Sequence, residues 1–318
     1  MRAHFAIAAG WALLVCVACV SCPAQNIEEG ELRTQLVPSP VKYSVLLPVS
    51  YGTSNKSYPL FFFLHGGDGD NGFLGRLAST FTAAWAAGEC PEMIVVTPSC
   101  ERSFYMDYRD GSQKWESVIV NELLPAIRAK YRVEKSKERT FIGGISMGGM
   151  GSLRMAFKHP DMFGAVVSME PGIEPAFAWK DVKLEDRFWR APGLMETIYG
   201  KPLDEAYWAA NNPATIARDH GAALKESGLA IYIEAGTEDS FGLHRGTEFL
   251  HRVLFDAGID HEYRLVLSAD HVGRSIPPRL RNGLGFLDRL MNPPAVDPAV
   301  DALHLLINRL KKQAGLEN

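Results

Sequence analysis

Short, almost wholly apolar runs recur along the chain and alternate with stretches of helical periodicity. The run Leu60–Leu64 has no polar residue, which is typical of a strand buried on both faces of a parallel sheet. The stretch Thr247–Ala257 instead places its large apolar residues on one side of a helix. The pattern predicts helices at Glu116–Tyr131, Met147–His159 and Thr247–Ala257. It predicts strands at Val41–Leu47, Leu60–Leu64, Met93–Thr97, Thr140–Gly143, Gly164–Ser168, Ala230–Glu234 and Glu262–Leu267.

The order of these elements predicts the fold class. Alternation of strands and helices over most of the chain indicates an α/β fold with one doubly wound, mostly parallel sheet and helices on both faces. The strand Val41–Leu47 and its neighbour are the exception, because we expect them to run antiparallel where the chain enters the sheet. We assign residues 25–292 to this domain.

Two regions depart from the alternation. Pro171–Gly228 has no evident strand and is rich in aromatic residues. Either its helices pack these aromatics on the sheet, or it forms a lid over the site in which Trp179 and Trp189 contact substrate. A Pro-rich break after Asn292 leads, within residues 293–318, to an amphipathic helix at Asp301–Lys312. This helix can dock on its own domain or on a partner, and we expect the former.

Residues 1–24 have the pattern of an export signal. An apolar stretch follows Arg2, and small residues then lead to Ala24, after which we expect cleavage. An uncleaved anchor is one alternative, and lipidation of Cys19 or Cys22 is another. We therefore predict a secreted or periplasmic protein with no stable membrane insertion once the signal is removed.

Composition narrows the function classes. The 318 residues are 47% hydrophobic and 22% charged, which provides enough apolar material for one sizeable core. The net charge is −4, and no basic stripe suits a nucleic acid. Nucleic-acid binding is therefore not expected.

Two cysteines, Cys90 and Cys100, lie outside the predicted signal. The segment between them reads as a buried strand, and each strand residue advances about 3.3 Å. The two ends then lie far beyond the roughly 5.5 Å between Cα atoms that a disulfide needs. We predict two unpaired thiols.

The most informative motif is Gly144-Ile145-Ser146-Met147-Gly148. It follows the predicted strand Thr140–Gly143 and precedes a helix. In a nucleophile elbow the serine occupies a strained strand-to-helix turn, and small residues two positions before and after it avoid clashes. The motif in this context predicts that Ser146 is a nucleophile.

A serine hydroxyl needs a base to accept its proton and an acid to orient that base. His271 follows the last predicted strand, and its loop lies where the site should be. His244 is the next candidate. Asp239 follows the strand Ala230–Glu234 and leads the candidate acids, ahead of Glu238 and Asp270.

Acyl transfer also needs hydrogen-bond donors for the developing oxyanion. The backbone N–H of Met147, directly after the nucleophile, is expected to be one donor. The other is expected from the loop His65–Gly69, where Gly67 is the better candidate and Asp68 the next.

Taken together, these motifs resemble the esterase D-like family of α/β-hydrolases, which is related to S-formylglutathione hydrolase, feruloyl and acetyl-xylan esterases and the antigen 85 mycolyltransferases. The resemblance runs from about Val41 to Leu290. Its marks are Leu64-His65-Gly66-Gly67, Trp115-Glu116, Gly144-Ile145-Ser146-Met147-Gly148-Gly149 and Lys158-His159-Pro160-Asp161-Met162-Phe163.

The resemblance implies an α/β-hydrolase fold with Ser146, Asp239 and His271 as the catalytic triad. It implies Gly67 and Met147 as oxyanion donors. The turn that contains Glu170 departs from the small, serine-rich turn of many members, so Glu170 is either a substrate contact or a surface acid.

The activity expected is hydrolysis of carboxylic esters through an acyl-enzyme, which requires no metal and no cofactor. The substrate is expected to be a small-molecule ester or one linked to a polysaccharide. Acyl transfer to a sugar or lipid alcohol is an alternative. A non-catalytic carbohydrate-binding protein is an alternative of another class.

Overall fold

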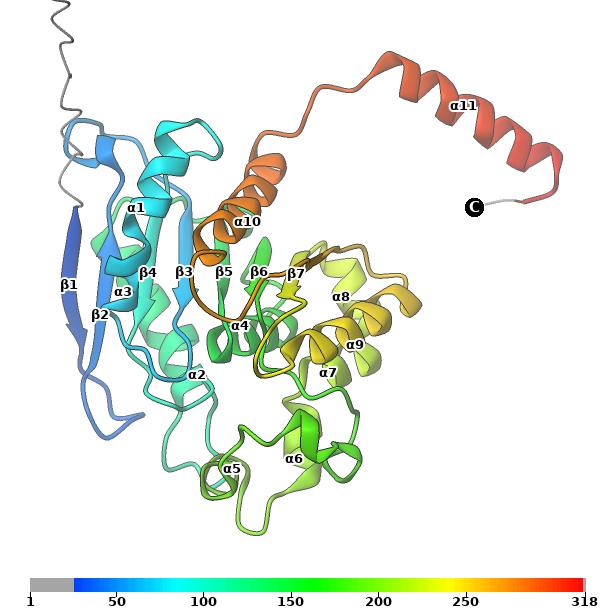
Figure 1. The fold of residues 1–318 in the computed structure, drawn as a ribbon. Coiled ribbons are helices and arrows are strands. Elements are labelled where there is room, and N and C mark those ends of the chain that lie inside the picture. Colours follow the sequence, from blue (N-terminus) through cyan, green and yellow to red (C-terminus); the bar gives the residue numbers. More distant parts are fainter. Residues whose placement is uncertain (1–25, 317–318) are drawn as a thin grey trace, which may run out of the picture.

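An eight-stranded sheet in the order β1-β2-β4-β3-β5-β6-β7-β8 forms the centre of the molecule (Figure 1). The structure is a computed structural model and describes residues 26–316, so the predicted signal at 1–24 lies outside the described residues. The neighbours from β4 through β8 pair in parallel, whereas β1 and β2 are antiparallel. The strands are β1 (Ile27–Leu32), β2 (Val41–Leu46), β3 (Leu60–Leu64), β4 (Ile94–Pro98), β5 (Thr140–Ile145), β6 (Ala165–Met169), β7 (Ala230–Gly236) and β8 (Glu262–Val266).

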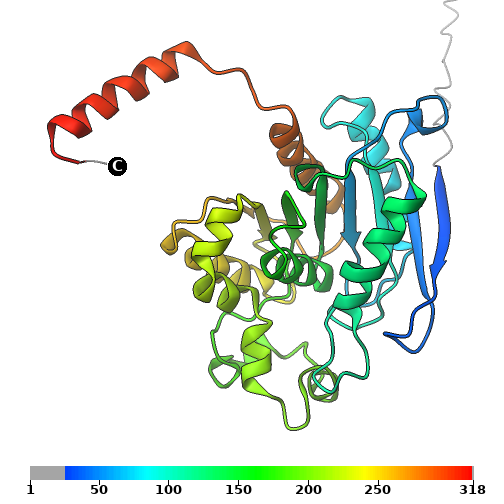
Figure 2. The same cartoon turned by 180° about the vertical axis from the view of Figure 1, so that it is seen from behind.

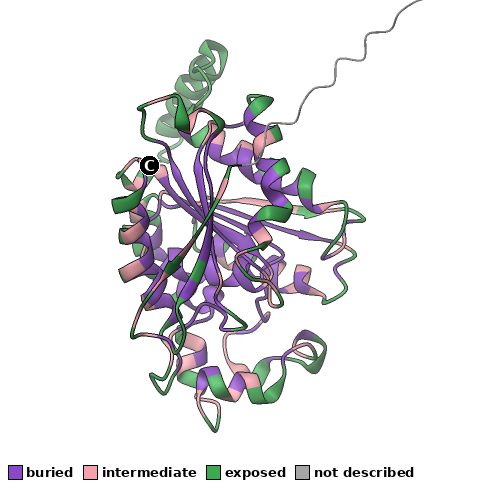
Figure 3. Ribbon diagram, turned by 90° about the vertical axis from the view of Figure 1, so that its left-hand side faces the viewer, coloured by how far each residue is buried: buried purple, intermediate pink, exposed green. Residues whose placement is uncertain are grey.

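Both faces of the sheet are covered by helices, as the apolar runs predict (Figures 1 and 2). In β3 the alternate residues Leu60, Phe62 and Leu64 belong to one buried cluster, and Phe61 and Phe63 belong to another. The helices α1 (Phe73–Ala86) and α10 (Ile276–Met291) cover the face of Phe61 and Phe63. Figure 3 shows the strands as the buried centre of the molecule.

The other face is covered by the remaining helices of the domain. A continuous helical stretch contains α2 (Trp115–Ser117), a π-helical turn at Val118–Leu123 and α3 (Leu124–Lys130). With it lie α4 (Met147–Lys158), α7 (Pro213–Asp219), α8 (Gly221–Ser227) and α9 (Leu243–Asp256). The helices α5 (Pro192–Tyr199) and α6 (Glu205–Ala210) lie beyond one end of the sheet (Figure 1). Short 3₁₀ turns occupy Val49–Gly52, Lys137–Arg139, Trp179–Asp181 and Leu184–Asp186.

The fold class predicted from the sequence is therefore confirmed, with three elements that the pattern did not predict. The strand β1 has no buried residue in the polar run Ile27–Leu32, so its apolar signal is weak. The helices α1 and α10 contain the poor helix formers Gly75 and Gly283, whereas the pair Pro277-Pro278 lies in the first turn of α10, where proline is tolerated. Packing on the sheet outweighs that propensity.

The C-terminal helix α11 (Pro298–Gln313) differs from expectation. We expected it to dock on its own domain, but none of its residues is buried and it projects away from the sheet (Figure 1). Its apolar face is solvent-exposed, with Leu303, Leu306, Ile307 and Leu310 between 41% and 54% exposed. The amphipathic pattern therefore predicted the helix correctly but not its packing.

One further prediction can be compared with the structure. Cys90 and Cys100 are free and buried, as predicted from the strand between them. Within residues 26–316, no helix is both long enough and apolar enough to cross a lipid bilayer.

Candidate active site

Ser146 occupies a strained turn between β5 and α4. Its backbone has φ 59° and ψ −117°, which is unfavourable for a residue with a side chain. The close approach of the two elements requires glycine on either side. A Cβ on Gly144 would lie 2.6 Å from the carbonyl oxygen of Leu64, and one on Gly148 would lie 2.2 Å from it. The turn itself is secured by a 2.9 Å hydrogen bond from the Ser146 N–H to the Met169 carbonyl.

The helix α4 is anchored behind this turn by a buried cluster of charges. The Glu116 carboxylate lies 2.9 Å from Lys158 Nζ, 3.0 Å from His159 Nε2 and 3.3 Å from Arg154 Nε. Burial disfavours ionisation of Glu116, but these three partners outweigh it and lower its pKa to about 2. Glu116, Lys158 and His159 therefore hold α4, the helix that follows Ser146, in place.

The two residues expected to donate N–H groups to the oxyanion come from two different parts of the chain. Met147 is the first residue of α4, and the N–H groups of a first helical turn have no acceptor within the helix. Gly67 lies in the turn after β3, and its carbonyl accepts a hydrogen bond from Arg102 Nε at 3.3 Å. Both residues line the pocket above Ser146.

His65 shapes the loop that carries Gly67. Its buried ring has Nδ1 2.7 Å from the Gly66 carbonyl, and Nε2 accepts the Cys100 N–H at 3.1 Å. Burial lowers the pKa of His65, which fits a neutral ring that donates through Nδ1 and accepts through Nε2. His65 therefore acts on the loop and not on the pocket.

Asp239 and His271 meet at the ends of β7 and β8. Asp239 Oδ2 accepts a hydrogen bond from His271 Nδ1 at 2.8 Å, and both side chains are buried. Asp239 Oδ1 accepts the N–H groups of Phe241 and Leu243 at 2.7 and 3.3 Å. Burial opposes ionisation of Asp239, but the hydrogen bond from His271 and the neighbouring Glu170 carboxyl group lower the pKa of Asp239 to about 2.

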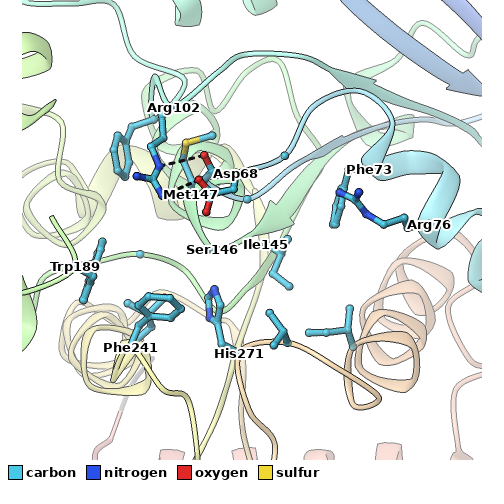
Figure 4. Close-up of a pocket in the computed structure, with 18 of the residues that line it drawn as sticks. Asp68, Phe73, Arg76, Arg102, Ile145, Ser146, Met147, Trp189, Phe241 and His271 are labelled. Carbon is cyan, nitrogen blue, oxygen red and sulfur yellow. Dashed lines mark hydrogen bonds and ion pairs between the residues drawn. The ribbon is translucent and has the colours of Figure 1, made fainter. Parts of the chain in front are cut away.

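Ser146 and His271 line the same pocket, and Figure 4 shows them on facing sides of it. Among the described residues, no hydrogen bond joins the two side chains. Within the predicted series Asp239–His271–Ser146, the hydrogen bond present in the structure is the one between Asp239 and His271. Catalytic hydrogen bonds are often long before substrate binds.

The pocket has a volume of about 630 Å³ and a largely apolar lining. Trp189 and Phe241 lie together along one side, and Phe73 and Arg76 lie on another (Figure 4). The Phe241 ring packs edge-on against His271, with ring centroids 4.7 Å apart. A pocket of this size and polarity can hold an aromatic or aliphatic acyl group beside Ser146.

The structure corrects two of the predicted substrate contacts. Glu170 is neither a substrate contact nor a surface acid, because it is fully buried behind Asp239. Trp179 lies outside the pocket and packs on Trp208, with centroids 5.6 Å apart. Trp189 does line the pocket. Each of the two interpretations of Pro171–Gly228 therefore holds for part of the region. Most of its aromatic residues pack against the core, whereas Trp189 lines the pocket.

The competing triad candidates have other surroundings. Asp270 Oδ1 accepts hydrogen bonds from the N–H and the hydroxyl of Ser240. Asp270 therefore links the loop after β8, which carries His271, to the loop after β7. Glu238 is exposed. His244 is the second residue of α9 and is not among the residues that line the pocket.

Glu170, Asp239 and His271 are the one group of acidic and histidine side chains in residues 26–316 close enough to hold a metal ion. Within the described part of the chain, all of their carboxyl oxygens except Glu170 Oε2 already have protein partners. Glu170 Oε1 accepts from Arg279, and both oxygens of Asp239 accept N–H donors. The Arg279 guanidinium therefore supplies positive charge beside Glu170.

Several residues of the site were not predicted. Arg279 on α10 binds both Glu170 and Glu234, and Phe241 contacts His271. Arg190 lines the pocket and pairs with the buried Glu174 at 2.6 Å. These partners are far apart in sequence, and no local motif marks them. Glu234 is the exception, because a carboxylate in an otherwise apolar predicted strand could have marked it as a residue of the site.

Comparison with known proteins is consistent with this geometry. Residues 34–268 match the protein family described as "Putative esterase". The chain is 29% identical over 278 residues to an esterase of Mycobacterium tuberculosis, which covers 81% of this chain. It spans only 58% of the length of that protein. It is also 25% identical over 203 residues to the diacylglycerol acyltransferase/mycolyltransferase Ag85A of Mycobacterium leprae, with 61% of this chain and 60% of that protein covered.

Solved structures agree on the fold. A ferulic acid esterase superposes with a TM-score of 0.69 at 25% identity and covers 84% of this chain and 98% of its own. An S-formylglutathione hydrolase from Agrobacterium tumefaciens superposes with a TM-score of 0.67 at 20% identity, over 83% of this chain and 94% of that one. Both are folds of the α/β-hydrolase type, as the sheet order indicates.

Proposed function

The chain belongs to the family described as "Putative esterase", and from this premise we propose that it hydrolyses carboxylic esters through an acyl-enzyme formed on Ser146. The observation that carries the proposal is the arrangement around the pocket. A strained serine faces a histidine whose other ring nitrogen is held by a buried aspartate at 2.8 Å. That combination activates a hydroxyl for attack on an acyl carbon.

The reaction follows from the positions of these groups. His271 Nε2 accepts the proton of Ser146 as Oγ attacks the ester carbonyl, and Asp239 stabilises the imidazolium that results. The N–H groups of Met147 and Gly67 stabilise the oxyanion. His271 then donates the proton to the leaving alcohol. Water enters, and His271 accepts its proton as the water oxygen attacks the acyl carbon. His271 then returns the proton to Ser146 Oγ as the free acid leaves.

The pocket supports a substrate with an apolar acyl part. Its apolar lining includes the rings of Phe73, Phe104, Trp189 and Phe241. One similar solved structure is a ferulic acid esterase, so an aromatic acyl group, including one linked to a carbohydrate, is the first to test. The predicted export signal adds a secreted or periplasmic location to the proposal.

Acyl transfer to a sugar or lipid alcohol is the second candidate. It is favoured by the similarity to a diacylglycerol acyltransferase/mycolyltransferase. The two reactions share the acyl-enzyme and differ only in the acceptor. Product analysis with added glycerol or trehalose distinguishes them, because transfer yields a new ester whereas hydrolysis yields only the free acid.

The test is a hydrolysis screen of acetyl, butyryl, feruloyl and long-chain esters with the wild-type chain and Ser146→Ala. We expect Ser146→Ala to lose several orders of magnitude in kcat/KM, because only binding and oxyanion stabilisation remain. A fluorophosphonate probe should label the wild type at Ser146 and leave the variant unlabelled. Full activity of Ser146→Ala would overturn the proposal. Absence of labelling in the wild type would favour a non-catalytic, carbohydrate-binding role.

A further inference from the structure

Glu170 is a buried carboxyl group that the proposed reaction does not use. It directly follows β6 and has no exposed surface. Its backbone has φ +46°, in the left-handed region where residues other than glycine and asparagine are uncommon. Such strain persists only where the surroundings enforce it, and it concentrates at functional sites. Both the burial and the backbone therefore require an explanation.

The two oxygens of Glu170 have different surroundings. Oε1 accepts hydrogen bonds from Arg279 Nη2 and, at 2.9 Å, from the Gly236 N–H. Oε2 is buried, and within residues 26–316 no N–H or O–H donor reaches it. Single atoms of Glu170, Asp239 and His271 lie within 4.8 Å of one another. A carboxyl oxygen of Glu170 thus lies within 4.8 Å of one of Asp239, and a proton on one of the two groups removes the repulsion between them.

The charges around Glu170 lead to the same conclusion. Three buried acids, Glu170, Glu234 and Asp239, lie near one buried cation, Arg279. Arg279 Nε binds Glu234 at 2.8 Å, and His271 donates to Asp239. If all three acids were ionised, the cluster would hold two uncompensated negative charges away from water. Buried carboxyl groups in this situation bind a proton.

The pKa values divide in the direction that a shared proton requires. Burial and the adjacent Asp239 raise the pKa of Glu170 to about 9. The pKa of Asp239 is instead lowered to about 2 by His271 and Glu170, against the effect of burial. At neutral pH the proton therefore resides on Glu170, and Asp239 carries the charge that His271 needs.

We propose that Glu170 is a neutral carboxylic acid that donates its proton in a hydrogen bond to Asp239 and so acts as a positioning residue for the Asp239–His271 pair. The proposal rests on the proposed function only for its kinetic consequence. Arg279 and the Gly236 N–H hold Oε1, which directs the O–H of Oε2 to Asp239. Asp239 then receives donors from Glu170, His271 and two backbone N–H groups.

Ionisation of Glu170 at high pH should weaken this arrangement. A second negative charge would then face Asp239 and repel it from the position that binds His271. The other titratable or charged groups facing the cluster are Glu234 and Tyr232 on β7, Arg264 on β8 and Arg279 on α10. None of these supplies a proton donor to Glu170 Oε2.

The experiment compares Glu170→Gln, Glu170→Leu and the matched control Glu116→Gln. Glutamine keeps both an acceptor for Arg279 and an N–H donor for Asp239, so activity at pH 7 should stay within a few-fold of wild type. Leucine keeps the volume but provides no donor, and kcat should fall about ten- to hundredfold with little change in KM. Glu116 is another buried acid but lies behind α4, so its amide should not change the pH profile of activity.

The profile of kcat/KM is the readout that packing alone would not move. Wild type and Glu116→Gln should lose activity as pH rises through about 9, the pKa of Glu170, whereas Glu170→Gln should not. Equal activity of the leucine and glutamine variants would overturn the proposal, and so would an unchanged high-pH loss in Glu170→Gln.

A spectroscopic measurement keeps the test independent of folding and of catalysis. The infrared carbonyl band of a protonated carboxyl group should be present at pH 7 in wild type and in Glu116→Gln. It should lose intensity in Glu170→Gln, even if Glu170→Leu fails to fold. No loss of this band would overturn the proposal. If the wild type hydrolyses no ester, the proposed function fails while the band still decides the protonation of Glu170.

Discussion

The two halves of the site are built by different means. Ser146 and Met147 are positioned by backbone, because glycines let α4 approach the Leu64 carbonyl closely. Asp239 and His271 are positioned by buried polar groups on three elements that lie far apart in the chain. The serine half should therefore be sensitive to side-chain volume. The acid–histidine half should be sensitive to charge and to the loss of a hydrogen bond.

This difference explains why one half is a contiguous motif and the other is not. A turn between a strand and the next helix involves neighbouring residues, so its requirements are written in five positions of the sequence. Arg279 reaches Glu170 and Glu234 across 109 and 45 positions of the chain. Only the parallel sheet brings these residues together, since it collects the carboxyl ends of its strands at one edge.

The largest effect should come from a substitution of Asp239, at the centre of the acid–histidine half. Asp239→Asn keeps the shape of the side chain but removes the charge, so His271 loses the partner that sets its tautomer and stabilises its imidazolium. We expect kcat/KM to fall about 10⁴-fold, with folding retained. Ester hydrolysis and circular dichroism measure the two effects. A loss below tenfold would show that Asp239 does not orient His271.

The serine half should be disrupted by added side-chain volume. In Gly148→Ala the new Cβ would lie 2.2 Å from the Leu64 carbonyl oxygen, where neither chain can move easily. We expect a loss of at least about 3 kcal/mol in the free energy of unfolding. Gly75→Ala in α1 is the control, because nothing lies within 4 Å of its Cβ. That change should be neutral or slightly stabilising.

A substitution of Glu116 tests whether charge also contributes to stability in the serine half, where Glu116 pairs with residues at α4. Its pKa is lowered to about 2 in the folded protein, below the unfolded value of about 4.3. Its ionised form therefore stabilises the fold above about pH 4, and this contribution is lost as pH falls toward 2. Glu116→Gln should cost about 3 kcal/mol at pH 7, since it leaves Arg154 buried without its partner. Urea unfolding from pH 2 to 7 should show a smaller acid loss in the variant.

The smallest effect should come from the wall of the pocket. Trp189→Ala removes an aromatic surface beside Phe241, and we expect KM for an aromatic ester to rise about tenfold with a smaller change in kcat. Trp179→Ala is the matched control, because Trp179 packs on Trp208 outside the pocket. It should lower stability and leave KM unchanged. A larger KM effect from Trp179 would place the substrate elsewhere.

Much of the fold was predictable because its signals are local. Leu60–Leu64 and the other apolar runs mark buried strands, and their alternation with helices is enough to predict a parallel sheet. The free state of Cys90 and Cys100 followed from the length of a strand. The packing of α11 was not predictable, because an amphipathic face indicates that a helix can bury apolar surface but not which surface covers it.

The sequence by itself determined the elbow at Ser146 and the positions along the chain of the strands that follow it. It also determined the loops on which Asp239 and His271 lie. Their physical basis is short-range, since it depends on a strained turn, on glycines and on strand ends. Only the tertiary structure decided that Glu170 lies buried behind Asp239, that Arg279 holds it, and that Trp189 rather than Trp179 faces the pocket. Those outcomes depend on which distant side chains share a buried volume, and burial controls both the charge state and the exposure of each residue.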